Sequence, residues 1–90
     1  MPNFDLNEAV YMYVIYLANG HYYTGISSDI VNRLSQHSSG SVKSTTFLRP
    51  VKLIYCELWP SRILAAKHER YVKNIGAKKY LASRQLYLLP

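Results

Sequence analysis

Residues 11–25 of this 90-residue chain read Tyr-Met-Tyr-Val-Ile-Tyr-Leu-Ala-Asn-Gly-His-Tyr-Tyr-Thr-Gly, and the predicted fold is organised around them. Aromatic and β-branched side chains stand on both sides of Asn19-Gly20. An Asn-Gly pair tolerates the positive φ angles of a tight turn, so the stretch predicts a β-hairpin with strands at about residues 10–18 and 21–26. Five of the nine tyrosines lie in this hairpin. Packing is the default explanation for any one of them, because aromatic pairs stabilise neighbouring strands.

The composition indicates one small basic domain. Hydrophobic residues make up 49% of the chain and charged residues 18%, which allows a core and argues against disorder. The net charge of +6 favours a polyanionic partner, either a nucleic acid or an anionic membrane surface. No stretch approaches the ~20 apolar residues of a membrane span, and the N-terminus lacks a signal-peptide pattern. We therefore expect a cytoplasmic protein with no membrane partner.

The single cysteine, Cys56, excludes an internal disulfide and a cysteine-based zinc site. It lies in the apolar run at residues 51–58, which predicts a buried structural thiol.

Turn and capping residues divide the rest of the chain into further elements. Ser27-Ser28-Asp29 offers N-cap chemistry for the first helix, and Ser61 and Gly76 bound the second. The order β-β-α-β-α-α predicts an α+β fold in which helices flank a three-stranded, mainly antiparallel sheet. After the hairpin, the expected elements are a helix at about 28–38, a loop to residue 50, a strand at 51–59, a helix at 61–75 and a short helix at 77–86. The expected divisions are a leader at 1–9, one domain at 10–86 and an apolar tail at 87–90 that packs on the core or forms a subunit contact.

The first expected helix carries a histidine on its apolar face. Ile30, Leu34 and His37 recur at helical spacing, and Arg33 lies at the edge of that face. One explanation is structural, with His37 bonded to a backbone carbonyl and Arg33 paired with Asp29. The other is a functional site, and the spacing alone does not separate the two.

The second expected helix carries an isolated carboxylate. From Arg62 onward there are seven Lys or Arg residues, and Glu69 is the only acidic residue. The commoner explanation of Glu69 is a salt bridge with Arg62 or Lys73, and the alternative is a ligand for Mg²⁺ or a similar hard cation. The expected apolar face consists of Leu64, His68, Tyr71, Val72 and Ile75, and Glu69 lies at its border in line with Ala65 and Val72.

Five segments together resemble the GIY-YIG nuclease superfamily, in particular its small single-domain bacterial branch. The triplets Tyr11-Met12-Tyr13 and Tyr23-Thr24-Gly25 resemble the two halves of the signature. Residues 29–37 are similar to the arginine-bearing helix of the family, and residues 43–55 and 65–70 to its later segments. The resemblance covers about residues 10–82, nearly the whole chain. Two positions depart from the signature, since Tyr11 and Thr24 replace a glycine and an isoleucine, but neither change removes a catalytic side chain.

The resemblance implies a catalytic set of Tyr13, Tyr23, Arg33, His37 and Glu69. Glu69 would bind a single Mg²⁺ or Mn²⁺ ion, and the planar guanidinium of Arg33 suits phosphate oxygens. Tyr13 would orient or deprotonate the attacking water, with His37 accepting the proton and Tyr23 positioning water or phosphate. An asparagine that some members use has no assigned counterpart here.

The resemblance further implies an endonuclease or exonuclease that acts on DNA, including single-stranded or structured DNA, with RNA not excluded, as a monomer or weak homodimer. The competing hypotheses are a catalytically idle nucleic-acid-binding module and a structural protein of a ribonucleoprotein. The presence of all five catalytic positions favours the enzyme. Expected nucleic-acid contacts are Lys43, Thr45, Arg49, Lys52, Lys67, Arg70 and Lys73, and Lys78 and Lys79 would add phosphate contacts.

A shared site for both tyrosines constrains the hairpin register. A two-residue loop at Asn19-Gly20 would pair Tyr16 with Tyr23 and place Tyr13 on the opposite face from Tyr23. Two tyrosines that act on one phosphate must share a face. We therefore predict a three-residue turn with Gly20 as a bulge, or a bulge elsewhere in the hairpin.

Overall fold

The structure, a computed structural model, describes residues 8–84. The predicted tail, most of the predicted leader and the end of the last predicted helix lie outside these residues. The elements are β1 (Val10–Tyr16), β2 (Tyr22–Ser27), α1 (Ile30–Ser39), the 3₁₀ helix η1 (Thr46–Leu48), β3 (Lys52–Trp59), α2 (Arg62–Ile75) and α3 (Ala77–Ser83). Their order confirms the predicted α+β fold. Between residues 8 and 84, no helix is long and apolar enough to cross a membrane.

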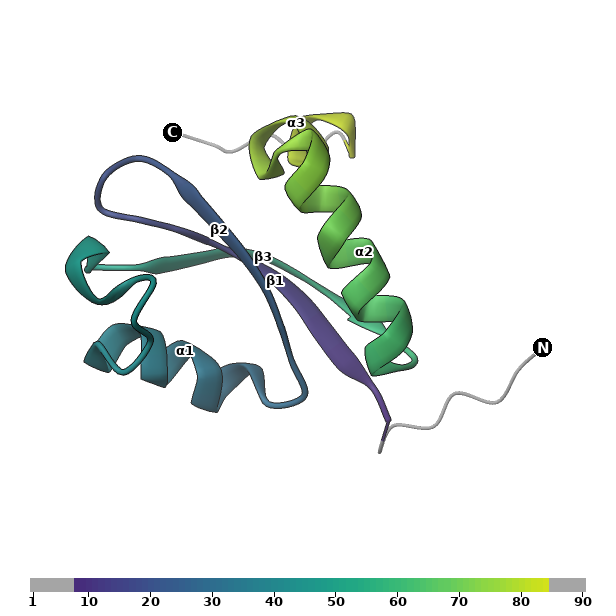
Figure 1. Cartoon of the computed structure of the whole chain (residues 1–90), viewed down its shortest axis with the longest axis horizontal. Helices are drawn as coiled ribbons and strands as arrows, with labels where there is room; N and C mark the ends of the chain where they lie inside the picture. The colour runs from purple at the N-terminus through teal and green to yellow at the C-terminus, as the bar shows by residue number, and fades with distance from the viewer. Residues whose placement is uncertain (1–7, 85–90) are drawn as a thin grey trace.

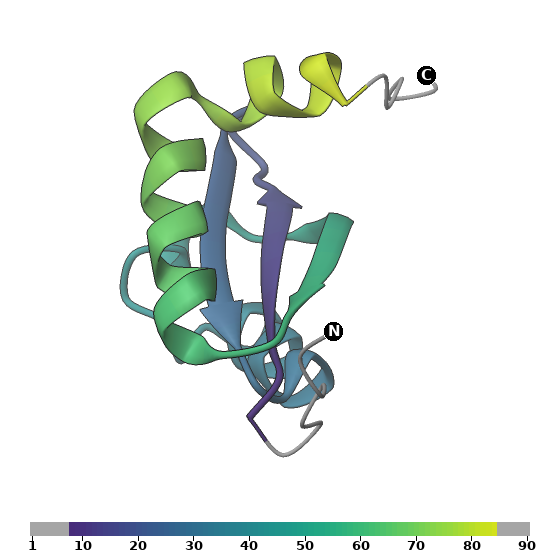
Figure 2. The same ribbon diagram turned by 90° about the vertical axis from the view of Figure 1, so that its right-hand side faces the viewer.

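The sheet is antiparallel with strand order β2-β1-β3, and helices cover both of its faces (Figures 1 and 2). On one face, Met12 and Val14 of the central strand pack against residues of α2 and α3. On the other face, Tyr13 and Ile15 pack with residues of α1 and η1. Because β1 is buried on both sides, its alternate residues belong to two separate cores.

The hairpin turn has the predicted odd length. The Leu17 N–H donates to the His21 carbonyl at 2.9 Å, and Gly20, with a φ of 86°, closes the three-residue loop between them. Gly20 fits because this left-handed conformation is strained for residues with a Cβ. The register pairs Ile15 with Tyr23, so Tyr13 and Tyr23 lie on the same face. The register prediction is confirmed.

Side-chain caps determine where the two long helices begin. The Asp29 carboxylate accepts a hydrogen bond from the Asn32 N–H at 3.1 Å, so Asp29 is the N-cap of α1 and not part of its first turn. Ser61 caps α2 in the same way, accepting from the Leu64 N–H at 3.2 Å. Gly76 ends α2, as predicted.

The buried stripe of α2 differs from the predicted apolar face. Ala65 and Val72 are fully buried, whereas Leu64 is 43% and Tyr71 53% exposed. The buried face of α2 is therefore centred on Ala65 and Val72, which the sequence placed at the border of the apolar face. Glu69, which is in line with Ala65 and Val72, is accordingly half-buried and not exposed to solvent like a residue of the outer face.

The expectation of a buried Cys56 is wrong, because its side chain is exposed. β3 is an edge strand, and Cys56 pairs with Tyr13 on the face that carries α1. The core on that face includes Val51, just before β3, and Leu53 near its start. Cys56 lies beyond this cover.

Candidate active site

Tyr13 extends from the central strand across its neighbour β2. Its side chain is 1% exposed, and its hydroxyl lies 2.9 Å from Nε2 of His37. Gly25 is the direct cross-strand partner of Tyr13, and a Cβ at position 25 would lie 2.5 Å from the Tyr13 hydroxyl. Only glycine leaves room for the phenol here. The sequence places Gly25 within a motif and carries no signal for this contact.

His37 is fully buried between two side-chain hydroxyl groups. Nε2 faces Tyr13, and Nδ1 lies 2.8 Å from Oγ1 of Thr45. The imidazole is thus satisfied by side chains and not by a backbone carbonyl. Thr45 is also fully buried, so in this structure it has no surface to offer a nucleic acid. We reassign Thr45 from the expected nucleic-acid contacts to the surroundings of His37.

Tyr23 completes an aromatic cluster on this face. Its ring centroid lies 6.4 Å from that of Tyr13 and 5.0 Å from that of His37. Tyr23 is only half-buried, whereas the other two rings are enclosed. The cluster therefore opens toward solvent at Tyr23.

Arg33 lies beside both tyrosines. Its Nη1 donates to Oε1 of Gln36 at 3.0 Å. Within residues 8–84, Arg33 forms no ion pair with Asp29, so that structural explanation of Arg33 does not hold. Interaction with the Tyr13 hydroxyl is the main reason that the pKa of Arg33 is raised, and Tyr23 adds to it. The guanidinium therefore stays charged next to the phenols.

Burial sets the protonation states of the Tyr13–His37 pair. It raises the pKa of Tyr13, although the nearby Arg33 guanidinium opposes the shift. Burial, together with the positive charge of Arg33, lowers the pKa of His37 below 6.5. At neutral pH His37 is therefore uncharged, with one ring nitrogen free to accept a proton.

Glu69 reaches the same cluster from α2. Its side chain is 20% exposed, and Oε2 lies 3.4 Å from Nζ of Lys73. Nζ of Lys73 in turn lies 6.0 Å from the centroid of the Tyr23 ring. The Glu69 charge also adds to the raised pKa of Tyr13, after burial as the main cause. The structure thus groups Tyr13, Tyr23, Arg33 and His37, and it links Glu69 to the Tyr23 side of this group through Lys73.

The donor set fits a cation shared with a substrate. Among residues 8–84, no three His, Cys, Asp or Glu side chains are grouped so as to hold a metal ion. Glu69 offers one carboxylate, and the cationic side chain beside it, Lys73, suits a phosphate group. Mg²⁺ keeps several waters and often binds through one or two carboxylates plus substrate phosphates, so a single Glu69 is sufficient.

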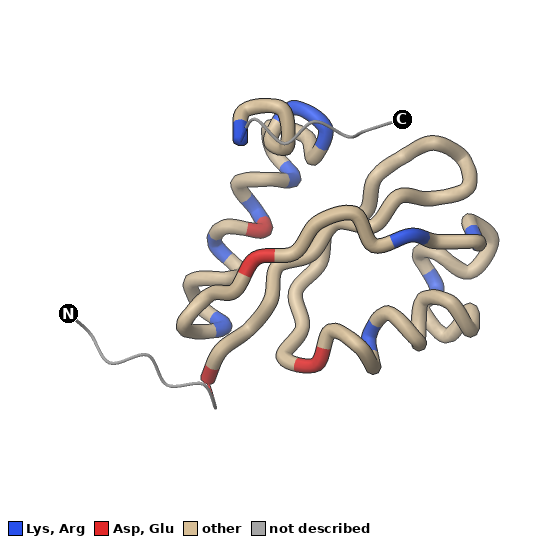
Figure 3. The backbone as a smooth tube through the Cα atoms, turned by 180° about the vertical axis from the view of Figure 1, so that it is seen from behind, with Lys and Arg blue, Asp and Glu red and all other residues tan. Residues whose placement is uncertain are grey.

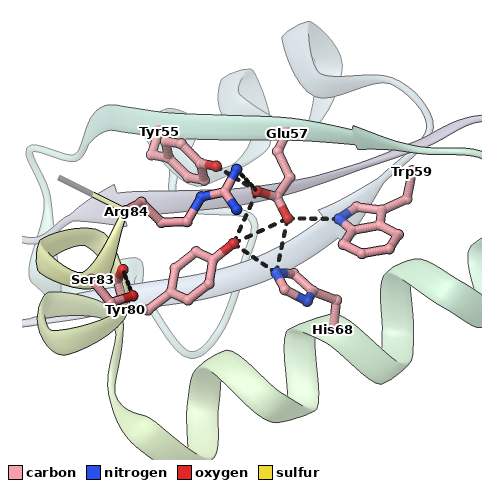
Figure 4. Close-up of polar contacts among 7 residues, drawn as sticks. All are labelled: Tyr55, Glu57, Trp59, His68, Tyr80, Ser83 and Arg84. Carbon is pink, nitrogen blue, oxygen red and sulfur yellow. Dashed lines mark hydrogen bonds and ion pairs between the residues drawn. The ribbon is translucent and has the colours of Figure 1, made fainter. Parts of the chain in front are cut away.

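A second polar cluster, which the sequence did not predict, lies on the opposite face of the sheet (Figure 4). The carboxylate of Glu57 accepts hydrogen bonds from the indole N–H of Trp59 at 2.8 Å and from the Tyr80 hydroxyl at 3.0 Å. His68 Nε2 lies 2.8 Å from the same carboxylate. We call this the Glu57 cluster, and its members are Tyr55, Glu57, Trp59, His68, Tyr80 and Arg84. Because it joins β3, α2 and α3, it fixes the helix that carries Glu69.

The signal for the Glu57 cluster was the alternation of Tyr55, Glu57 and Trp59 along one strand. Residues two apart in a strand share a face, so three polar-tipped side chains had to meet there. His68, expected on an apolar face, is their partner on α2.

The basic side chains expected to contact nucleic acid lie mostly at the surface. Figure 3 shows that Lys and Arg positions are frequent along α2 and α3. Arg49 donates from Nε to the Thr46 carbonyl at 2.8 Å, so part of its guanidinium is engaged within the loop. The exposed members of the expected set are Lys43, Arg49, Lys52, Lys67, Arg70 and Lys73.

Known proteins match this chain over most of its length. The profile described as the GIY-YIG catalytic domain matches residues 9–81. UPF0213 protein SSP2268 of Staphylococcus saprophyticus is 35% identical over 72 residues, which are 79% of this chain and 88% of that protein. A UPF0213 protein of Staphylococcus aureus is 32% identical over 75 residues, which are 82% of this chain and 92% of that protein.

A solved structure gives the same result for the fold. The solution NMR structure of UPF0213 protein BH0048 from Bacillus halodurans aligns with a TM-score of 0.56 and 29% identity, covering 91% of this chain and 88% of that one. With the profile match and the two relatives, it shows that the chain belongs to the GIY-YIG family of endonucleases.

Proposed function

We propose that this protein is a divalent-metal-dependent nuclease that hydrolyses phosphodiester bonds in DNA. The observation that carries the proposal is the meeting of two phenols, an imidazole, a guanidinium and a carboxylate from four elements. A fold that only bound nucleic acid would need the basic surface but not a buried tyrosine–histidine pair. The family membership supports a nuclease in general.

Tyr13 and His37 supply the proton path. A phenol with a raised pKa is a poor base by itself at neutral pH. With His37 Nε2 at 2.9 Å, the Tyr13 hydroxyl passes its proton to the imidazole while it takes one from the attacking water. The water oxygen then forms its bond to phosphorus. His37 can accept this proton because it is neutral at pH 7.

Arg33, Tyr23 and Glu69 act on the phosphate. The charged guanidinium of Arg33 binds non-bridging phosphate oxygens, and the half-buried Tyr23 positions water or phosphate at the open side of the cluster. Glu69 would hold one Mg²⁺ or Mn²⁺ ion, which when bound neutralises phosphate charge and stabilises the leaving oxygen. Lys73, already 3.4 Å from Glu69, is available to the same phosphate.

The test is a cleavage assay with purified protein. Wild type and Glu69→Ala are incubated with single-stranded, duplex and branched DNA and with RNA, each in Mg²⁺, Mn²⁺ or EDTA. Glu8→Ala, which removes an exposed carboxylate outside the cluster, is the matched control. We expect wild type and Glu8→Ala to cut DNA only with a metal, and Glu69→Ala to lose the activity. DNA binding without cleavage on any substrate would refute the proposal in favour of an idle binding module.

A further inference from the structure

Each ring nitrogen of His37 has a hydroxyl partner, so the distances are compatible with a proton on either nitrogen. Neutral imidazole has one N–H donor and one acceptor nitrogen. Only the form with its proton on Nδ1 presents a lone pair to the Tyr13 hydroxyl at Nε2. The other form would present an N–H to Tyr13 and could not take its proton. The proton path described above therefore needs one tautomer and fails with the other.

Thr45 is the group that contacts Nδ1. Its hydroxyl lies 2.8 Å from Nδ1 of His37, and both side chains are fully buried. A hydroxyl has a single hydrogen, and Oγ1 of Thr45 has a second partner, the Val42 carbonyl at 3.4 Å. When the hydroxyl hydrogen points to that carbonyl, a lone pair of Oγ1 is left to accept from Nδ1–H.

The loop that carries Thr45 is held firmly against the end of α1. The Thr45 N–H donates to the Val42 carbonyl at 3.0 Å, and the Leu48 N–H donates to the Thr45 carbonyl at 2.9 Å. The hydroxyl of the next residue, Thr46, lies 2.8 Å from the carbonyl oxygens of both Gly40 and Val42, and its one hydrogen is donated to either of them. These bonds fix the position of Oγ1 relative to the imidazole.

We infer that Thr45 is a positioning residue that holds His37 in the tautomer protonated on Nδ1, so that Nε2 accepts the proton of Tyr13. The use of this arrangement rests on the nuclease function proposed above, but the tautomer itself does not. Thr45 touches neither substrate nor reacting atoms and acts only through His37. A hydroxyl buried in a surface loop thereby decides whether the phenol can act as a base.

The direct test is the ¹⁵N chemical shift of each ring nitrogen of His37, measured by NMR at neutral pH. In the wild type we expect an N–H-type shift for Nδ1 and an acceptor-type shift for Nε2. Thr45→Ser keeps the hydroxyl and should retain this pattern. Thr45→Val keeps the shape without the hydroxyl and should shift His37 toward the Nε2–H form. Ser44→Ala is the matched control, because it removes an exposed neighbouring hydroxyl that does not contact His37, and it should leave the pattern unchanged.

Activity gives a second readout. Thr45→Val should lower the cleavage rate by ~10-fold or more, and Thr45→Ser should restore it. An Nε2–H tautomer in the wild type would overturn the inference even if Thr45→Val does not fold. An Nδ1–H tautomer in a wild type that cleaves no nucleic acid would instead keep the inference and refute the nuclease function.

Discussion

Two small contacts position the proposed reacting groups, Tyr13 and His37. Gly25 lets the Tyr13 ring lie across β2, and Thr45 contacts the far side of the His37 ring. The family resemblance implied roles for Tyr13 and His37, and helical spacing alone placed His37 only on an apolar face. The sequence did not predict the roles of Gly25 and Thr45, because close approach and burial depend on neighbours that are distant along the chain. The sequence thus indicated the proposed reacting groups, and the packed structure identified the residues that position them.

The contact between Gly25 and Tyr13 predicts a specific incompatibility. In Gly25→Ala the new Cβ would lie 2.5 Å from the Tyr13 hydroxyl, so the ring must move and its bond to His37 must lengthen. We expect a loss of about 1–3 kcal/mol in the free energy of unfolding, measured by urea denaturation. In a Tyr13→Leu background the same substitution should cost much less, because the clashing atoms are gone. Equal costs in both backgrounds would show that the crowding does not exist.

The buried position of His37 predicts its titration. Burial and Arg33 lower its pKa from 6.5, so NMR titration of the His37 ring should give a midpoint below that value. The unfolded chain then binds a proton at higher pH than the folded chain does. The contribution of His37 to stability is therefore complete above about pH 6.5 and decreases as the pH falls below it. A midpoint at or above 6.5 would contradict the described surroundings of His37.

Among the secondary-structure elements, α1 and α2 carry the candidate site residues that lie outside the hairpin. Their starting points depend on N-caps, and the orientation of α2 depends also on polar contacts. Caps at Asp29 and Ser61 are visible in the sequence, which is why the helix positions were predicted closely. The rotation of α2 was predicted less well. Its apolar face was read from hydrophobic spacing, whereas His68 binds a carboxylate and Tyr71 stays exposed. The exposed Cys56 was missed for a related reason, since strand patterns do not tell how far a covering helix extends.

The Glu57 cluster predicts an acid-sensitive anchor for α2 and α3. Burial alone would raise the pKa of Glu57, but hydrogen bonds from Tyr55, Trp59 and Tyr80 outweigh it, so the net pKa is lowered from 4.5. A carboxyl with a lowered folded pKa stabilises the protein above about pH 4.5 and loses this contribution as the pH falls further. We expect Glu57→Gln to cost about 1–3 kcal/mol near pH 7 in urea denaturation.

The pH dependence of this cost provides its check. The difference between wild type and Glu57→Gln should shrink as the pH is lowered from 7 to about 3, because protonation removes the same charge in the wild type. Glu8→Gln changes an exposed carboxylate and should cost little at any pH. A Glu57→Gln cost that is absent at pH 7, or constant with pH, would contradict an ionised anchor.

For the molecule as a whole, the charge distribution matters more than any single contact. The net charge of +6, with Lys and Arg frequent along α2 and α3, suits the phosphate backbone (Figure 3). Composition predicted a polyanionic partner, either a nucleic acid or an anionic membrane surface, since the net charge does not depend on the fold. It could not rank the basic residues, because exposure and internal bonds, as at Arg49, appear only in the structure.

Nucleic-acid binding should therefore depend on salt through the exposed residues of α2. The binding constant is measured in a Glu69→Ala background, in which we expect no cleavage. There, Arg70→Ala should reduce the steepness of log K against log salt by about 0.9, the value for the loss of one phosphate contact. Fluorescence polarisation with a labelled oligonucleotide at several salt concentrations measures it. An unchanged slope would show that Arg70 faces solvent in the complex.

Tyr13 and His37 are proposed to act as one unit in the attack on phosphorus. The rate losses caused by replacing each of them should therefore not multiply in the double variant. The most direct measurement is the single-turnover cleavage rate of wild type, Tyr13→Phe, His37→Ala and the double variant with saturating metal. We predict that each single substitution lowers the rate by ~100-fold or more, and that the double variant is slower than the single variants by less than ~10-fold. Wild-type rates in the single variants, or losses that multiply in the double variant, would contradict the account.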